Sequence, residues 1–305
     1  MAGGTGAIGG HVIPTLVGEG HAVTALARTP EKASGLTAQG ATAVPVSLFD
    51  RSALTTVFGG HDAVVNLASA IPPMTRFMGS KAWSSNDRVR TEGSAAVVDA
   101  ALAAGVGRVV QESVCMLYRD QGTNWVDEDA PIDRYPRARA NLAAEANAHR
   151  FSAADGTGIV LRFGWFYGLG AAHSEQLFSQ ARRHLGLVLG PPAGYVSSIH
   201  LADAAAAVAA ALHAPAGTFN IVDDEPLTKR EYADALARAA GRTMWLRGPG
   251  RAALVFGDRL TSLTRSLRVS NARFRAATGW APRYPSAREG WIATAAALDQ
   301  RRHPA

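Results

Sequence analysis

Apolar runs of strand length alternate with segments of helical period over the first two thirds of the chain. The strand-length runs lie at 21–27, 41–49, 62–68, 108–114, 158–164 and 218–223. The helical segments lie at 10–18, 51–58, 89–104, 138–153 and 201–212. The strands are continuously apolar rather than alternating, so we expect helices on both faces of the sheet. The pattern predicts an α/β fold with a doubly wound parallel sheet.

The pattern loosens after residue 165, where helices are expected at 173–184, 229–240, 250–265, 270–278 and 286–300. No Pro/Ser-rich linker separates the two parts. We therefore expect a sheet domain over 1–165 and a smaller, mostly helical C-terminal lobe over 166–305, interleaved with the last strands. The cleft between them is the expected site.

A glycine-rich loop, GGTGAIG at 3–9, stands at the start of the chain, with a predicted helix and a strand behind it. Glycines spaced in this way allow a tight turn, close approach of a pyrophosphate and packing of the helix on its strand. The sequence therefore predicts a Rossmann-type dinucleotide site held by Gly3, Thr5, Gly6, Ala7, Ile8 and Gly9. Only Met1 and Ala2 precede the loop, so we expect its strand to begin about five residues upstream.

The second strand ends at a basic residue, Arg28, and no carboxylate follows before Glu31. An NAD site usually places an acidic side chain here to accept from the ribose, whereas Arg28 and Lys32 suit a 2′-phosphate. NADP(H) is therefore favoured over NAD(H), although a solvated turn arginine is the alternative. Three further residues are expected around the adenosine: Asp50, which could equally cap the helix starting at Arg51, and Ala68 and Ser69.

Composition narrows the class of protein. The 31 basic and 25 acidic residues give a formal charge of +6, but the chain has three lysines and no stripe of basic and aromatic residues, which argues against nucleic acid. The single cysteine, Cys115, excludes an internal disulfide, and no metal-ligand spacing occurs. With no membrane-length apolar run and no signal-like start, we expect a cytoplasmic protein that acts on a small molecule. Helices on the outer faces of the sheet are compatible with a homodimer.

Several stretches together resemble the extended short-chain dehydrogenase/reductase superfamily, which includes NAD-dependent epimerases, dehydratases and related reductases. They are GGTGAIG (3–9), VVQESVCMLY (109–118), LRFGWFYG (161–168), SSIHLADAAAA (197–207), GTFNIVDDEPLT (217–228) and TGWAPRY (278–284). They cover nearly the whole chain in the family's order. The resemblance implies a Rossmann domain with a C-terminal substrate lobe.

Catalysis in that family uses a Ser or Thr at a strand end and a Tyr-x-x-x-Lys on the next helix. Counting back from Tyr118, the usual hydroxyl position falls on Val114, and Ser113 would face the opposite side of a regular strand. Ser113 remains a candidate if the strand end is irregular. Tyr118 is a second candidate, because it lies at the carboxyl edge of the sheet.

Two registers are open for the Tyr-x-x-x-Lys motif. In the first, Tyr135 and Arg139 keep the spacing, with Arg in place of Lys. In the second, NLAAE (141–145) aligns with the family's Lys-x-x-x-Glu, which puts Asn141 at the lysine position and Arg137 at the tyrosine position. The second fits the helix better, and it removes the usual proton donor.

These residues predict an NADP(H)-dependent oxidoreductase that acts on a carbonyl or hydroxyl group of a small metabolite. Two alternatives stay open. One is a redox-neutral epimerase, dehydratase or isomerase that retains NAD(P), and the other is a non-catalytic NADP(H)-sensing protein with an eroded Tyr-Lys pair.

Overall fold

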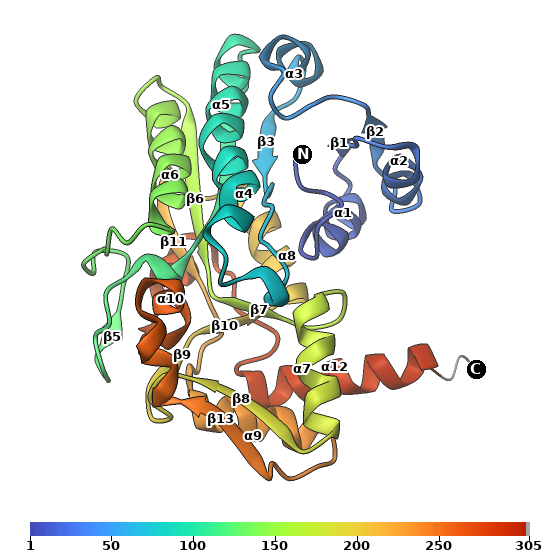
Figure 1. The fold of residues 1–305 in the computed structure, drawn as a ribbon. Coiled ribbons are helices and arrows are strands. Elements are labelled where there is room, and N and C mark those ends of the chain that lie inside the picture. Colours follow the sequence, from blue (N-terminus) through green and yellow to red (C-terminus); the bar gives the residue numbers. More distant parts are fainter. Residues whose placement is uncertain (303–305) are drawn as a thin grey trace.

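A parallel sheet forms the centre of the molecule in the computed structural model, which describes residues 1–302 (Figure 1). Four strands pair in the order β11-β6-β4-β3, namely β3 (Ala63–Asn66), β4 (Arg108–Val114), β6 (Thr157–Phe163) and β11 (Gly217–Ile221). Two shorter strands, β1 (Thr24–Leu26) and β2 (Thr42–Val44), pair parallel with each other. The predicted parallel α/β fold is confirmed.

Met1 and Ala2 join the two sets of strands. The Ala2 amide donates to the Val65 carbonyl at 2.9 Å, and on the other side the Leu26 amide donates to the Met1 carbonyl at 3.0 Å. These two residues therefore occupy the position of the central strand that leads into the glycine loop. With them, the strand order is that of a dinucleotide-binding sheet.

Helices cover both faces of the sheet, as the continuously apolar strands predict. Val65 packs in one cluster with α1 (Gly9–Gly18), α2 (Pro30–Thr37) and α8 (Leu201–Ala211). Its neighbour Val64 packs in another with α3 (Arg51–Phe58), α5 (Ser94–Ala103) and α6 (Ala138–Ser152). Because successive strand residues point to opposite faces, each buries its side chain under a different helical layer.

The C-terminal lobe packs across the carboxyl ends of the strands (Figure 1). Its centre is Trp291, fully buried with Tyr167 and Phe178. Its helices are α7 (Ala172–Arg182), α9 (Lys229–Ala239), α10 (Thr261–Thr264), α11 (Ala272–Thr278) and α12 (Ala287–Arg302). Short strand pairs complete it: β7 (Trp165–Tyr167) with β10 (Ser198–His200), β8 (Leu185–Leu189) with β13 (Leu246–Gly250), and β9 (Tyr195–Val196) with β12 (Leu227–Thr228). A further pair is β5 (Trp125–Val126) with β14 (Arg268–Val269).

Two predicted helices differ from the structure, and one helix was not predicted. The segment 89–104 divides into a π-helical turn, Val89–Gly93, that follows α4 (Ser84–Arg88) and leads into α5. The segment 250–265 divides into a 3-10 segment, Arg251–Arg259, and α10, because Gly257 has a φ of 48° that breaks the helix. Helix α2 was not predicted, although Thr29-Pro30 is a recognisable start: the Thr29 side chain accepts from the Lys32 amide, and Pro30 occupies the first turn.

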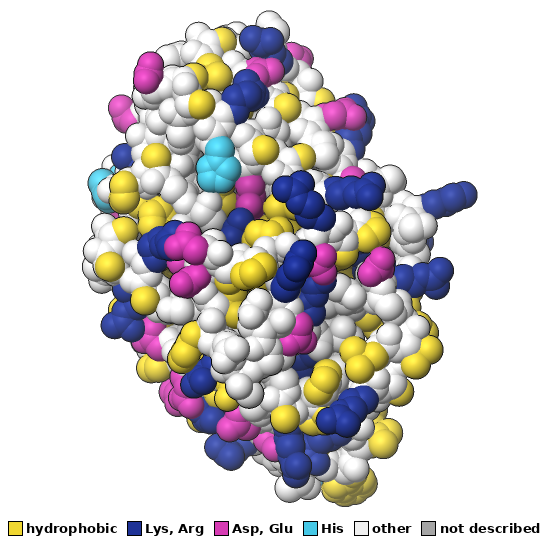
Figure 2. All heavy atoms as spheres, turned by 90° about the vertical axis from the view of Figure 1, so that its left-hand side faces the viewer, with side chains coloured by type: hydrophobic (Ala, Val, Ile, Leu, Met, Phe, Trp, Pro, Cys, Tyr) yellow, Lys and Arg dark blue, Asp and Glu magenta, His cyan; other side chains and the backbone are white. Residues whose placement is uncertain are grey.

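Surface charge is mixed on the face shown in Figure 2, where Lys and Arg side chains are interspersed with Asp and Glu. Within the described part of the chain, every helix is too short or too polar to cross a bilayer. Residues 1–302 also hold no group of three or more His, Cys, Asp or Glu side chains placed to bind a metal ion.

Candidate active site

The glycine loop has the close contacts that a dinucleotide turn requires. Gly3 has a φ of 81°, and a Cβ there would lie 2.5 Å from the Leu67 carbonyl carbon. A Cβ at Gly9 would lie 2.3 Å from the Gly3 carbonyl oxygen. Among residues 1–302, the amides of Ala7 and Ile8 donate to no backbone carbonyl, and no side chain caps the start of α1. Free amides at a helix N-terminus suit a pyrophosphate, so this loop fits the diphosphate of a dinucleotide.

The other predicted cofactor residues follow strands β1, β2 and β3 along the chain. Arg28 is exposed just after β1, and Lys32 is exposed in the first turn of α2. The Asp50 carboxylate accepts from the Ala53 amide at 3.0 Å, so it caps α3 while its exposed face stays open to a ligand. The Ala68 amide donates to the Asn66 side chain at 3.2 Å, and Ser69 lines the cavity described next.

A cavity of about 380 Å³ extends from the glycine loop to the C-terminal lobe. Its near end is formed by Gly6, Ala7 and Ile8. Its walls are mainly apolar, and aromatic rings contribute much of them: Phe77, Trp83, Tyr135, Trp165 and Phe166. The polar and charged lining residues include Ser69, Asn86, Arg90, Glu112, Arg137, Asn141, His173, Gln176 and Ser262. A volume in this range is typical of a small-molecule site.

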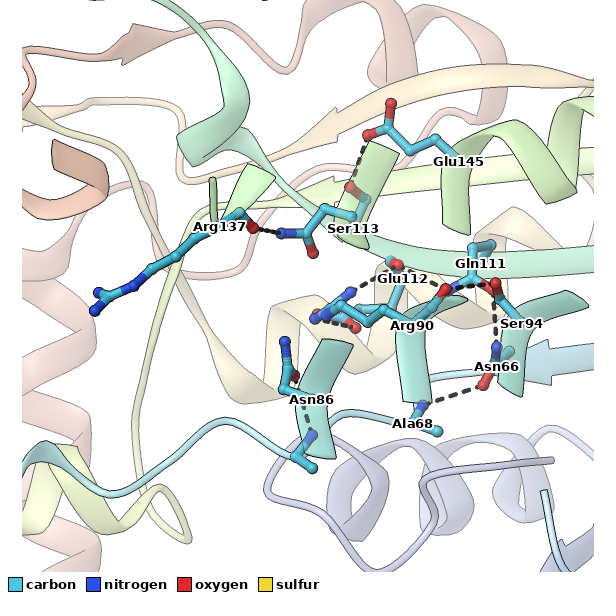
Figure 3. Close-up of polar contacts among 12 residues, drawn as sticks. Asn66, Ala68, Asn86, Arg90, Ser94, Gln111, Glu112, Ser113, Arg137 and Glu145 are labelled. Atoms are coloured by element: carbon cyan, nitrogen blue, oxygen red, sulfur yellow. Dashed lines mark hydrogen bonds and ion pairs between the residues drawn. The ribbon is translucent and has the colours of Figure 1, made fainter. Parts of the chain in front are cut away.

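Two of the predicted catalytic residues, Ser113 and Tyr118, are buried away from this cavity. The Ser113 hydroxyl is fully buried and donates to Glu145 on α6 at 2.7 Å (Figure 3). The Tyr118 hydroxyl is also buried, where it donates to Asn220 at 2.7 Å and accepts from Arg162 at 2.9 Å. Strand β4 is regular to its last residue, so Val114 faces the cavity and Ser113 faces α6. Both hydroxyls therefore take part in a structural network centred on the Arg162–Glu145 pair.

The start of α6 places the remaining predicted residues. Arg137 and Asn141 both line the cavity, as does Tyr135, whereas Arg139 is exposed on the outside of the helix. The Asn141 amide nitrogen donates to the Arg137 carbonyl at 3.3 Å, while its oxygen is buried without a hydrogen-bond partner in the described structure. The Tyr135–Arg139 pair of the first register is therefore not assembled, and the second register, Arg137 with Asn141, faces the cavity.

The Tyr135 hydroxyl is poorly suited to acid catalysis. It donates to the Met116 carbonyl at 3.3 Å, and the Arg265 guanidinium lies 4.7 Å from its ring centre. Burial raises the pKa of Tyr135 to about 12, despite the opposing charge of Arg265. A catalytic tyrosine in this role usually has a lowered pKa, so the surroundings of Tyr135 do not favour it as the proton donor.

The cavity also contains a buried ion pair that was not predicted from the sequence. Arg90, from the π-helical turn, lies 2.8 Å from a carboxylate oxygen of Glu112 on β4, and both side chains are almost fully buried (Figure 3). Burial raises the pKa of Glu112, and the charge of Arg90 opposes that shift. A glutamate inside an otherwise buried strand needs a cation nearby. The glutamate in the apolar run VVQESV could therefore have indicated a buried ion pair.

Comparison with known proteins shows the family to which the chain belongs. The profile of an NAD(P)H-binding family matches residues 3–215. A curated relative from a Streptomyces species, a 3-diazoavenalumate denitrifying reductase, is 33% identical over 301 residues, which span 95% of this chain and 97% of that protein. The chain belongs to this NAD(P)H-binding family, and it is an NAD(P)-binding oxidoreductase.

Solved structures share the fold over the whole chain. A dTDP-glucose 4,6-dehydratase from Streptomyces venezuelae with NAD bound has a TM-score of 0.81 at 19% identity, covering 99% of this chain and 96% of that one. A UDP-glucose 4-epimerase from Thermus thermophilus, in complex with NAD, has a TM-score of 0.79 at 21% identity, covering 100% and 98%. The architecture is thus that of the extended short-chain dehydrogenases/reductases, as the sequence resemblance implied.

Proposed function

We propose that this protein is an NADP(H)-dependent reductase whose substrate needs no proton from the protein when it is reduced. One observation carries the proposal: Arg137, at the N-cap of α6, and Asn141, within α6, line the cavity. In the second register they stand where the family has tyrosine and lysine. An arginine remains charged at all accessible pH values and an amide has no acidic proton, so neither replaces the usual donor.

Different residues of the chain hold different parts of the cofactor. The amides of Ala7 and Ile8 bind the diphosphate, and Arg28 with Lys32 binds the 2′-phosphate that distinguishes NADP(H). The buried, unpaired amide oxygen of Asn141 accepts from a hydroxyl of the nicotinamide ribose, which the family's lysine otherwise holds. When bound in this cavity, the reduced cofactor would supply a hydride, the two-electron equivalent needed to replace the N₂ of a diazonium group by hydrogen.

The relative's chemistry explains why a proton donor is dispensable. Its name describes a reductase that removes nitrogen from a diazo compound. Reduction of a carbonyl group develops an oxyanion that must be protonated, whereas loss of N₂ from a diazonium carbon leaves no such anion. An apolar cavity without an activated tyrosine suits the second reaction. We infer that the substrate reacts as a small diazonium compound rather than as a carbonyl compound or a nucleotide sugar.

The experiment follows the oxidation of NADPH at 340 nm with an aryl diazonium salt, with a panel of aldehydes and ketones, and without enzyme. The expected result is turnover of the diazonium salt above the uncatalysed rate, release of N₂, and transfer of deuterium from C4-deuterated NADPH to the carbon that carried nitrogen. Turnover of carbonyl compounds alone would contradict the proposal. Conversion of a substrate without net NADPH oxidation would favour the redox-neutral alternative.

Cofactor preference has its own test. Arg28→Ala is expected to weaken NADPH binding roughly 10- to 100-fold, the size of a charge-assisted hydrogen bond, and to leave NADH binding almost unchanged. Arg51→Ala, an exposed arginine on α3, is the matched control. Equal affinity of the unmodified protein for NADPH and NADH would refute the preference. The expected cytoplasmic location and the homodimer stay predictions.

A further inference from the structure

We propose that the cavity binds the substrate as an aromatic monocarboxylate, with its carboxylate on the Arg137 guanidinium. This inference rests on the proposed function, because it concerns the substrate end of the same cavity. The family's position for a proton donor thereby becomes a binding position in this chain. Three features carry the argument: the charge balance of the lining, the way Arg137 is held, and the nature of the walls.

The lining has one uncompensated charge. Arg90 and Glu112 form a buried ion pair and neutralise each other. Burial lowers the pKa of His173, which keeps that ring neutral near pH 7. Among the described residues of the lining, this leaves Arg137 as the charged group that forms no ion pair. The cavity therefore has a net charge of about +1, which suits a single carboxylate better than a doubly charged diphosphate.

Arg137 is fixed in place but keeps donors available. One terminal nitrogen donates to the Phe77 carbonyl at 2.8 Å, and the other donates to the Arg259 carbonyl. Its guanidinium carbon also lies 4.8 Å from the ring centres of both Phe77 and Trp83. These two hydrogen bonds leave three of the five N–H groups of a guanidinium free. A guanidinium that is already ordered loses little entropy when it binds a carboxylate.

The charges around Arg137 do not neutralise it. Burial lowers the pKa of Arg137. Arg259, at the end of the 3-10 segment, lowers it further, whereas Asp87 on α4 raises it. Asp87 forms no ion pair with Arg137, and burial raises the pKa of its carboxyl group. The positive charge of Arg137 is therefore available to a ligand.

The walls around the guanidinium favour an aromatic body on the acid. Phe77 and Trp83 meet edge to face at 5.0 Å, and Trp165 packs in the same way against His173 at 5.6 Å. All four line the cavity. Aromatic rings in such arrangements stack well on a further ring, and they offer a polar sugar few hydrogen-bond partners. The lining thus combines an apolar slot with one cationic end.

The experiment measures binding of probe ligands by calorimetry to the protein saturated with NADP⁺. The probes are benzoate and cinnamate, each compared with its neutral amide. The expected result is that at least one acid binds roughly 10- to 100-fold more tightly than its amide. Arg137→Gln should abolish that difference, and Arg137→Lys should retain part of it. Arg139→Gln, an exposed arginine on the same helix, should behave like the unmodified protein.

Dinucleotide binding in the same samples separates the possible failures. Loss of NADP⁺ binding by the unmodified protein would refute the proposed function itself. Normal NADP⁺ binding with no binding of either acid, or with equal binding of acid and amide, would overturn only the inference about Arg137. An Arg137→Gln protein that binds NADP⁺ normally and still prefers the acid would overturn it as well.

Discussion

The substitution Gly9→Ala tests the geometry of the dinucleotide loop most directly. A Cβ at Gly9 would lie 2.3 Å from the Gly3 carbonyl oxygen and 2.6 Å from the carbonyl carbon and oxygen of Gly4. These neighbours are backbone atoms, so they cannot rotate away as a flexible side chain would. The loop must move, and overpacking of this kind costs about 1–3 kcal/mol. Because the same backbone forms the pyrophosphate site, dinucleotide affinity should fall by at least about tenfold.

The adjacent Gly10 provides a matched control, since a Cβ there meets nothing within 4 Å. Gly10→Ala should stabilise the protein by about 0.4–1 kcal/mol, because alanine restricts the unfolded chain and favours the helix. The assay is chemical denaturation of both variants, together with titration of NADPH by fluorescence. We expect the two free energies of unfolding to differ by about 1.5–4 kcal/mol. Equal stabilities and equal affinities would refute the contact argument.

Three further predictions concern the buried polar groups. Glu145→Gln should lower the free energy of unfolding by about 3–5 kcal/mol, because it leaves the Arg162 guanidinium buried without its carboxylate, measured by urea denaturation. Tyr118→Phe should cost about 1–2 kcal/mol by the same assay while NADPH affinity is retained, since the lost hydrogen bonds lie outside the cavity. Burial lowers the pKa of His200 from 6.5 to about 4, so its stabilising contribution is present above pH 6.5 and is lost as the pH falls toward 4. His200→Asn, which retains a capping side chain, should reduce that acid-induced loss, about 3 kcal/mol at most, when denaturation is compared at pH 7 and pH 4.5.

A specific result would contradict each of these three predictions. A Glu145→Gln protein as stable as its parent would show that the Arg162 charge is compensated elsewhere. A loss of NADPH affinity in Tyr118→Phe would return Tyr118 to the binding site. An unchanged acid dependence in His200→Asn would assign that dependence to other groups.

The apolar pattern of the sequence determined much of the fold. Strand β4 and helix α3 have the bounds that were predicted for them, because each is a run of residues whose burial is set by local periodicity. The glycine loop was also predictable, since its glycine spacing is a short sequence motif, although Gly3 also packs against the distant Leu67 backbone. The missed helix α2 has little apolar periodicity, and only its Thr-Pro start distinguishes it.

The candidate catalytic residues needed the tertiary structure. The sequence alone predicted that Ser113 and Val114 face opposite sides of their strand, but which side holds the cavity depends on α6 and on the C-terminal lobe. The sequence also left two registers open for the Tyr-x-x-x-Lys motif. The start of α6 at Ala138 favours the second register, because Arg137 and Asn141 line the cavity and Arg139 is exposed to solvent.

Local periodicity thus fixed the elements of this protein, because burial within one helix or strand depends on residues a few positions apart. The site depends on side chains that are brought together from distant parts of the chain. Glu112 meets Arg90 across 22 residues, and Arg137 meets the Phe77 carbonyl across 60. No local pattern encodes such pairs, so only the packing of the elements decided which charges are neutralised and which one is left to face a ligand.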